Sequence, residues 1–182
     1  MTTTLLCLLL SGVFAQAQTN ARDLYFESDE SEAFAIRIAV GKKTAGRARS
    51  VNPTILFQSG DVIQFEVSSR GAGYLYVAVQ GSDGSWSVLF PGPEKFSTSA
   101  QVSARRPVRT SAAFDDKPGE ELVYFVYTRE PYSSGTSLLA ALKQAPAAAL
   151  AKVEYGNDAD SNAIFATSNR SPLIVRVSLR HQ

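Results

Sequence analysis

Apolar and polar residues alternate along the stretch from Gly60 to Pro91, and glycine-rich turns interrupt the alternation at residues 70–73 and 81–84. A period of two places every second side chain on one face of a strand, so each uninterrupted block predicts a β-strand with one buried face. We therefore expect three successive strands that form an antiparallel meander. In the second strand Leu75 and Val77 occupy the core face, which turns the neighbouring tyrosines to the opposite face.

Three further segments have strand patterns. Residues 34–40 and residues 173–179 alternate cleanly, with their larger apolar side chains on one face. Residues 122–128 are apolar or aromatic on both faces, which is typical of a central strand that is covered on both sides. The short spacing of these strands and the turn residues between them favour a β-sandwich over a βαβ fold.

Little helix is expected. Ser137 can cap a helix over residues 138–143, and the alanine-rich residues 147–152 can add a further turn or two. The predicted fold class is therefore mainly β, an antiparallel β-sandwich with a small helical insert before the last strand. We expect residues 34–182 to form this sandwich as a single domain.

The N-terminal segment has the pattern of a secretory signal. An apolar run over residues 5–14 is followed by small residues at Ala15 and Ala17, so we expect residues 1–17 to be a signal peptide and the mature chain to begin at Gln18. No later apolar segment approaches the roughly 20 residues of a membrane-spanning helix. Residues 18–33 predict a polar, acidic arm whose apolar anchor is residues 24–26. The expected localisation is periplasmic or secreted.

Charge and composition restrict the chemistry. The net charge is +1, which provides no field for nucleic acid, so no nucleic-acid partner is expected. The one cysteine, Cys7, lies inside the signal, so the mature chain has neither a disulfide nor a thiol nucleophile. The one histidine, His181, is penultimate and is expected at a frayed end, which disfavours a Ser-His-Asp triad and a zinc site. We accordingly expect no catalytic residues, no metal and no cofactor.

Two groups of oxygen ligands leave alternatives open. Paired carboxylates can hydrolyse glycosides, and the candidates lie at turns or strand starts: Asp61, Asp83, Asp115, Asp116, Glu120 and Glu121. The spacing of Asp158, Asp160 and Asn162 is similar to the start of a calcium loop, but Ala163 stands where an EF-hand has glycine. The sequence leaves open whether these three residues bind calcium.

A set of short motifs in fixed order resembles the bacterial family known as domain of unknown function 4384. The motifs are Gly60-Asp61-Val62, Gly73-Tyr74-Leu75-Tyr76-Val77, Gly84 with Leu89-Phe90-Pro91, Pro118-Gly119-Glu120-Glu121 and Arg129-Glu130-Pro131. The resemblance covers about residues 55–131. It implies a secreted or envelope β-domain with an accessory role, since members of the family are sometimes fused to kinase or caspase-like peptidase modules. It implies no mechanism.

These observations predict an exported, non-catalytic binding or accessory module of the bacterial envelope. Its expected partner is an envelope protein or an acidic glycan. Strand aromatics, including Trp86, either fill the core and its rim or supply the flat surface of a recognition face. Arginine binds carboxylate or phosphate in a planar, bidentate way. The predicted ligand-binding residues are Tyr74, Tyr76, Arg105 and Arg106. The alternative is a carboxylate-based hydrolase that acts on envelope or extracellular glycans.

Overall fold

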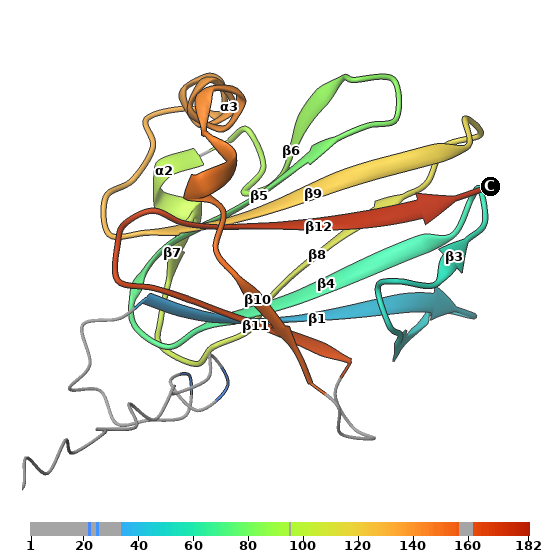
Figure 1. Cartoon of the computed structure of the whole chain (residues 1–182), viewed down its shortest axis with the longest axis horizontal. Coiled ribbons are helices and arrows are strands. Elements are labelled where there is room, and N and C mark those ends of the chain that lie inside the picture. The colour runs from blue at the N-terminus through green and yellow to red at the C-terminus, as the bar shows by residue number, and fades with distance from the viewer. Residues whose placement is uncertain (1–21, 23–24, 26–33, 95, 157–161) are drawn as a thin grey trace, which may run out of the picture.

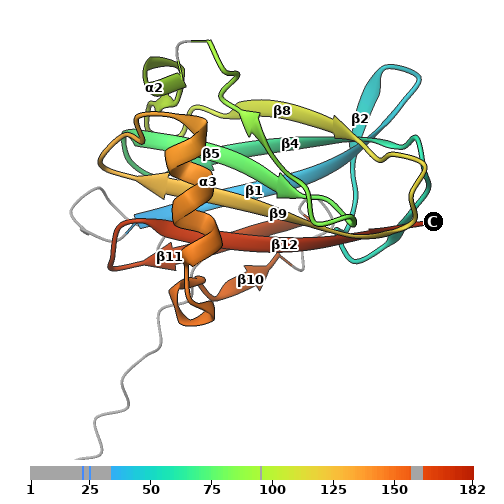
Figure 2. The same ribbon diagram turned by 90° about the horizontal axis from the view of Figure 1, so that it is seen from above.

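Two six-stranded sheets pack face to face in the computed structural model (Figures 1 and 2). It describes residues 22, 25, 34–94, 96–156 and 162–182. Sheet A has the order β10-β11-β1-β4-β8, with β2 paired to β1, and sheet B has the order β3-β12-β9-β5-β6, with β7 paired to β5. All pairs are antiparallel except β3 with β12. The mainly β sandwich with a small helical insert is confirmed.

The bounds of the elements are as follows. Sheet A consists of β1 (Phe34–Thr44), β2 (Arg47–Ser50), β4 (Val62–Ser69), β8 (Val108–Ala113), β10 (Val153–Tyr155) and β11 (Ala163–Ser168). Sheet B consists of β3 (Leu56–Phe57), β5 (Gly73–Gln80), β6 (Trp86–Phe90), β7 (Gln101–Val102), β9 (Gly119–Thr128) and β12 (Leu173–His181). The helices are α2 (Phe96–Ser99), α3 (Gly135–Gln144) and the 3₁₀ helix η1 (Ala147–Ala149).

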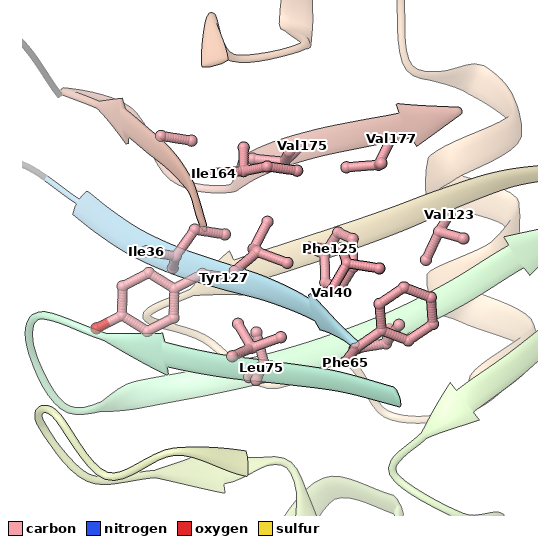
Figure 3. Close-up of a cluster of buried hydrophobic side chains, with 14 of the residues drawn as sticks. Ile36, Val40, Phe65, Leu75, Val123, Phe125, Tyr127, Ile164, Val175 and Val177 are labelled. Carbon is pink, nitrogen blue, oxygen red and sulfur yellow. The ribbon is translucent and has the colours of Figure 1, made fainter. Parts of the chain in front are cut away.

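The main core lies between the two sheets and is built by the alternating positions of their strands (Figure 3). On β4, Phe65 is buried and meets Phe125 of β9 edge to face, with ring centroids 5.4 Å apart. On β12 the predicted inward positions are all buried in this core: Leu173, Val175, Val177 and Leu179. The face assignments made from the period-two pattern are thus confirmed for these strands.

The predicted meander is wrong at its first turn. β4 pairs with β1 and β8 in sheet A, whereas β5 pairs with β9, β6 and β7 in sheet B. Residues 70–72 therefore carry the chain from one sheet to the other. Alternation does not distinguish a hairpin from such a crossover, because the strand on either side buries one face in the same core.

Strand β9 is central, as its two apolar faces predicted. It lies between β12 and β5 and is covered by the main core on one side and by the helices on the other. Several short elements were not predicted. Among them, β2 forms a hairpin with the end of β1, and β11 pairs with the other part of β1.

The helices cover the face of sheet B that points away from sheet A (Figures 1 and 2). Leu138 and Leu142 of α3 are buried in a second apolar cluster, together with Tyr76 and Ile174 of the sheet. The helix cap is Ser134, whose side chain accepts a hydrogen bond from the Ser137 amide. The predicted cap, Ser137, is instead the third helical residue of this capping box, so the helix begins earlier than expected.

The acidic arm is described at two positions only. Tyr25 is buried on the outer face of sheet A against Phe165, and its hydroxyl lies 2.7 Å from the Ser68 hydroxyl. The tyrosine thus acts as the apolar anchor that the sequence predicted within residues 24–26. The predicted signal peptide lies outside the described residues, as do Asp158 and Asp160. Within the described parts of the chain, none of the helices has the length and apolarity needed to cross a bilayer.

Candidate functional site

Tyr76, one of the four predicted ligand-binding residues, has no exposed surface. Its ring stacks on Phe96 and meets Tyr132 edge to face, each with centroids 5.3 Å apart, and its hydroxyl accepts a hydrogen bond from the Tyr132 amide. Burial raises the pKa of its phenol. The side chain is therefore part of the second core and not of a surface. The period-two pattern assigned it to the correct face but did not show that α2 and α3 cover that face.

The other three predicted residues remain near the surface at one end of the sandwich. Tyr74 is partly buried and pairs with Gln101 of β7. Arg105 and Arg106 follow in the exposed turn between β7 and β8, where the Arg105 amide donates to the Ser69 carbonyl. Tyr74 and the two arginines thus share one end of the fold, whereas Tyr76 lies beneath the helices.

Two further basic residues of sheet A, Lys42 and Arg109, are paired with acids. Lys42 Nζ lies 2.6 Å from a carboxylate oxygen of Asp61. Arg109 reaches Glu66 at 2.7 Å, and Glu66 lies between strands β1 and β8 on the outer face of the sheet. These ion pairs leave less positive charge for an acidic ligand than the sequence suggested.

An apolar groove lies on the helical side of sheet B, bounded by β6, α2 and the start of α3. Its volume is about 660 Å³. It is lined by apolar residues and by hydroxyl-bearing residues: Trp86, Val88, Pro91, Pro93, Phe96, Leu139, Ser87, Ser97, Ser133, Ser134 and Thr136, with Gly135. None of these described lining residues carries a charged side chain.

Local structure explains the groove. On β6, alternation turns Trp86 and Val88 to the helical side, and the Trp86 ring stacks on Tyr124 of β9 with centroids 5.0 Å apart. Lys143 of α3 reaches over the same ring at 6.0 Å. Both neighbours hold the indole in place, so it forms a rigid wall of the groove. Sequence reasoning included Trp86 among the recognition aromatics but missed Tyr124 and Lys143 as its neighbours, because both come from distant segments.

A second, acidic site lies on the opposite face of β6, between the two sheets. The hollow there has a volume of about 290 Å³ and gathers three of the six candidate carboxylates: Asp83, Asp115 and Glu121. The other three are elsewhere. Asp61 pairs with Lys42, Glu120 accepts a hydrogen bond from Ser178, and Asp116 does not line the hollow.

His181 adjoins this acidic site, and the expectation that it lies at a frayed end is wrong. It belongs to β12, pairs with Gly119 and Phe57, and is only 3 % exposed. Gln182 beyond it is also held, since its amide donates to the Phe57 carbonyl and its own carbonyl accepts from Ser59. The parallel strand β3 pairs with the C-terminal end of β12, which the local sequence does not reveal.

The imidazole of His181 stacks on Phe114 with centroids 4.4 Å apart, and its Nε2 lies 3.6 Å from Glu121 Oε1. Desolvation raises the pKa of the Glu121 carboxyl, and the charge that His181 carries when protonated partly offsets that rise. Single ligand atoms of Asp115, Glu121 and His181 all lie within 4.8 Å of one another. The sequence missed this cluster because its three members come from separate elements.

Comparison with known proteins gives one match. Residues 56–131 match the family model described as "Domain of unknown function (DUF4384)". The matched segment runs from β3 past the end of β9 and contains β6, α2, Asp115 and Glu121. No curated protein and no solved structure matches the chain. The resemblance stated from the ordered motifs is thus confirmed over these residues.

Proposed function

We propose that this chain, whose residues 56–131 match the DUF4384 family model, is an exported, non-catalytic binding module of the bacterial envelope. We further propose that the groove beside β6 binds an uncharged, partly apolar segment of a partner protein. The observation that carries the proposal is the groove itself, with its rigid Trp86 wall, its apolar floor and its hydroxyl rim.

The chemistry of the groove favours a peptide segment over an acidic glycan. Its volume lies within the range of roughly 300–1,000 Å³ that is typical of ligand sites. Apolar side chains of a partner would be desolvated against Val88, Phe96 and Leu139, and the serine and threonine hydroxyls can bond to its backbone amides and carbonyls. An acidic ligand would be desolvated without a cation from the described lining residues, which is costly.

A charged side chain placed over the groove tests this proposal. Thr136 is exposed at the groove rim, so Thr136→Arg is expected to abolish binding of a partner protein from the native envelope fraction, while stability changes by less than about 0.5 kcal/mol. Ala140→Arg is the matched control, because Ala140 is exposed on the same helix but does not line the groove. Affinity capture with quantitative mass spectrometry measures both variants and the wild type.

The two outcomes are distinct. A partner retained by the wild type and by Ala140→Arg but lost by Thr136→Arg supports the groove. Equal retention by all three proteins contradicts it. The double variant Arg105→Ala/Arg106→Ala tests the arginine end of the sandwich in the same assay. If only this variant binds the partner more weakly, and its binding depends less on salt concentration, the site lies at the arginine end.

The second candidate function is a carboxylate-based hydrolase, and one observation favours it. Glu121 is largely buried with a raised pKa, as suits a general acid, and Asp115 lies beside it. Release of reducing ends from envelope glycans, lost in Glu121→Gln, would establish this activity and overturn the non-catalytic proposal. No release by the wild-type protein supports the binding module.

Export rests on the N-terminal sequence and has its own test. If residues 1–17 are a signal peptide, the intact mass of the protein recovered from the periplasm or medium corresponds to a chain that begins at Gln18. Ala17→Leu, which removes a small residue from the cleavage site, is expected to leave the precursor uncleaved. A recovered chain that retains residues 5–14 would contradict export by this route.

A further inference from the structure

The geometry points to a metal site, formed by His181, Glu121 and Asp115, for one divalent cation of the Zn²⁺ class. This inference goes beyond the proposed function and concerns the opposite side of β6 from the groove. The sequence predicted no metal, because it offered a single histidine and no mature cysteine.

The first observation is the state of the imidazole. Both ring nitrogens of His181 are buried, and neither has a hydrogen-bond partner among the residues that the structure describes. A buried polar group without a partner costs about 1–3 kcal/mol, so native structures rarely keep one. The separation of 3.6 Å between Nε2 and Glu121 Oε1 exceeds a normal hydrogen bond. A cation bound between His181 Nε2 and Glu121 Oε1 would give each of these two atoms a partner.

The second observation is the spacing of the three ligands. Zinc binds histidine nitrogen and carboxylate oxygen at about 2.0–2.2 Å, so neighbouring ligand atoms around a tetrahedral ion lie roughly 3.4 Å apart. The separation of 3.6 Å between the histidine and Glu121 fits this value, and all three ligand atoms lie within 4.8 Å. Separations longer than the tetrahedral value require a ligand side chain to move toward the ion. Asp115 can make this small movement, because it is the exposed member of the three.

The backbone holds the ligands from three directions. Glu121 and His181 lie diagonally across the β9–β12 pair, in which His181 faces Gly119 and Glu121 faces Leu179. Asp115 follows Phe114, whose amide donates to the Asp61 carbonyl and whose ring stacks on the imidazole. One Asp115 oxygen, Oδ1, accepts a hydrogen bond from the Lys117 amide, which leaves the other free to bind a cation.

The donor set selects the class of ion. An imidazole nitrogen beside carboxylates suits Zn²⁺, Co²⁺ or Ni²⁺, whereas Ca²⁺ and Mg²⁺ prefer oxygen ligands alone. The hollow of about 290 Å³ adjoins Asp115 and Glu121, so the ion would keep positions for water. Asp83 lines the same hollow and adds negative charge, although its carboxylate pairs with Lys117 at 3.6 Å.

Zinc titration of the untagged full chain tests the site. Calorimetry with Zn²⁺ at neutral pH is expected to give one bound ion per chain, and the melting temperature is expected to rise with free Zn²⁺ as binding linkage requires. Asp115→Asn is expected to weaken binding by at least about tenfold. The fold should be retained, because Asp115 is exposed and the asparagine oxygen can still accept the Lys117 hydrogen bond. Asp116→Asn is the matched control, since this exposed neighbour is outside the cluster.

Each outcome decides the inference. One-to-one binding that is weakened by Asp115→Asn and by His181→Gln, but kept in Asp116→Asn, supports the site. The Asp115 variant keeps the test valid even if replacement of the buried histidine impairs folding. Absence of zinc binding, equal affinity in the Asp115 and Asp116 variants, or Ca²⁺ binding as tight as Zn²⁺ overturns it. If His181 and Glu121 form only an ion pair with each other, no zinc binding is expected.

Discussion

Phe65→Ala is expected to lower the free energy of unfolding by about 3–5 kcal/mol. Phe65 is 1 % exposed, lies at the middle of β4, and packs edge to face on Phe125 of the opposite sheet. The substitution removes buried apolar surface and leaves a cavity between the two sheets, where neither sheet can close the gap without bending. Urea unfolding followed by far-ultraviolet circular dichroism measures the change.

Tyr155→Ala provides the control for this measurement. Tyr155 is 48 % exposed on the edge strand β10, so its replacement is expected to change stability by less than about 0.5 kcal/mol. A Phe65→Ala variant as stable as the wild type would mean that β4 presents its other face to the core, which would contradict the register of sheet A.

Tyr76→Ala is expected to cost a similar amount, about 3–5 kcal/mol. The side chain is fully buried between sheet B and the helices, and it stacks on Phe96. Its loss also leaves the Tyr132 amide without the hydroxyl that accepts its hydrogen bond. Thermal unfolding of the variant, with near-ultraviolet circular dichroism to follow the aromatic packing, measures the effect.

Two companion variants separate the causes. Tyr76→Phe keeps the ring and removes the hydroxyl, so it is expected to cost only about 1–3 kcal/mol, the desolvation cost of one unpaired buried amide. Tyr74→Ala, on the same face but only partly buried, is expected to cost less than Tyr76→Ala. Equal, small effects of the two alanine variants would show that the helices do not cover this face, and would restore Tyr76 to the predicted recognition surface.

The sequence by itself determined where the longer strands lie and which of their faces turn inward. The alternation in β1, β5 and β12 does this because side chains on a strand point to opposite faces in turn, and burial of one face demands apolar residues there. The apolar residues on both faces of β9 identified its central place for the same reason. The ordered motifs also showed the resemblance to the family whose model matches residues 56–131.

The tertiary structure decided which strands pair and what covers each face. The turn at residues 70–72 looks locally like a hairpin, but it joins two sheets, because pairing depends on strands that are distant in sequence. The helices bury Tyr76 and form the groove beside Trp86, and β3 buries His181 next to Glu121. Candidate sites of this kind are built from separate segments, so no local pattern carries the information that brings their side chains together.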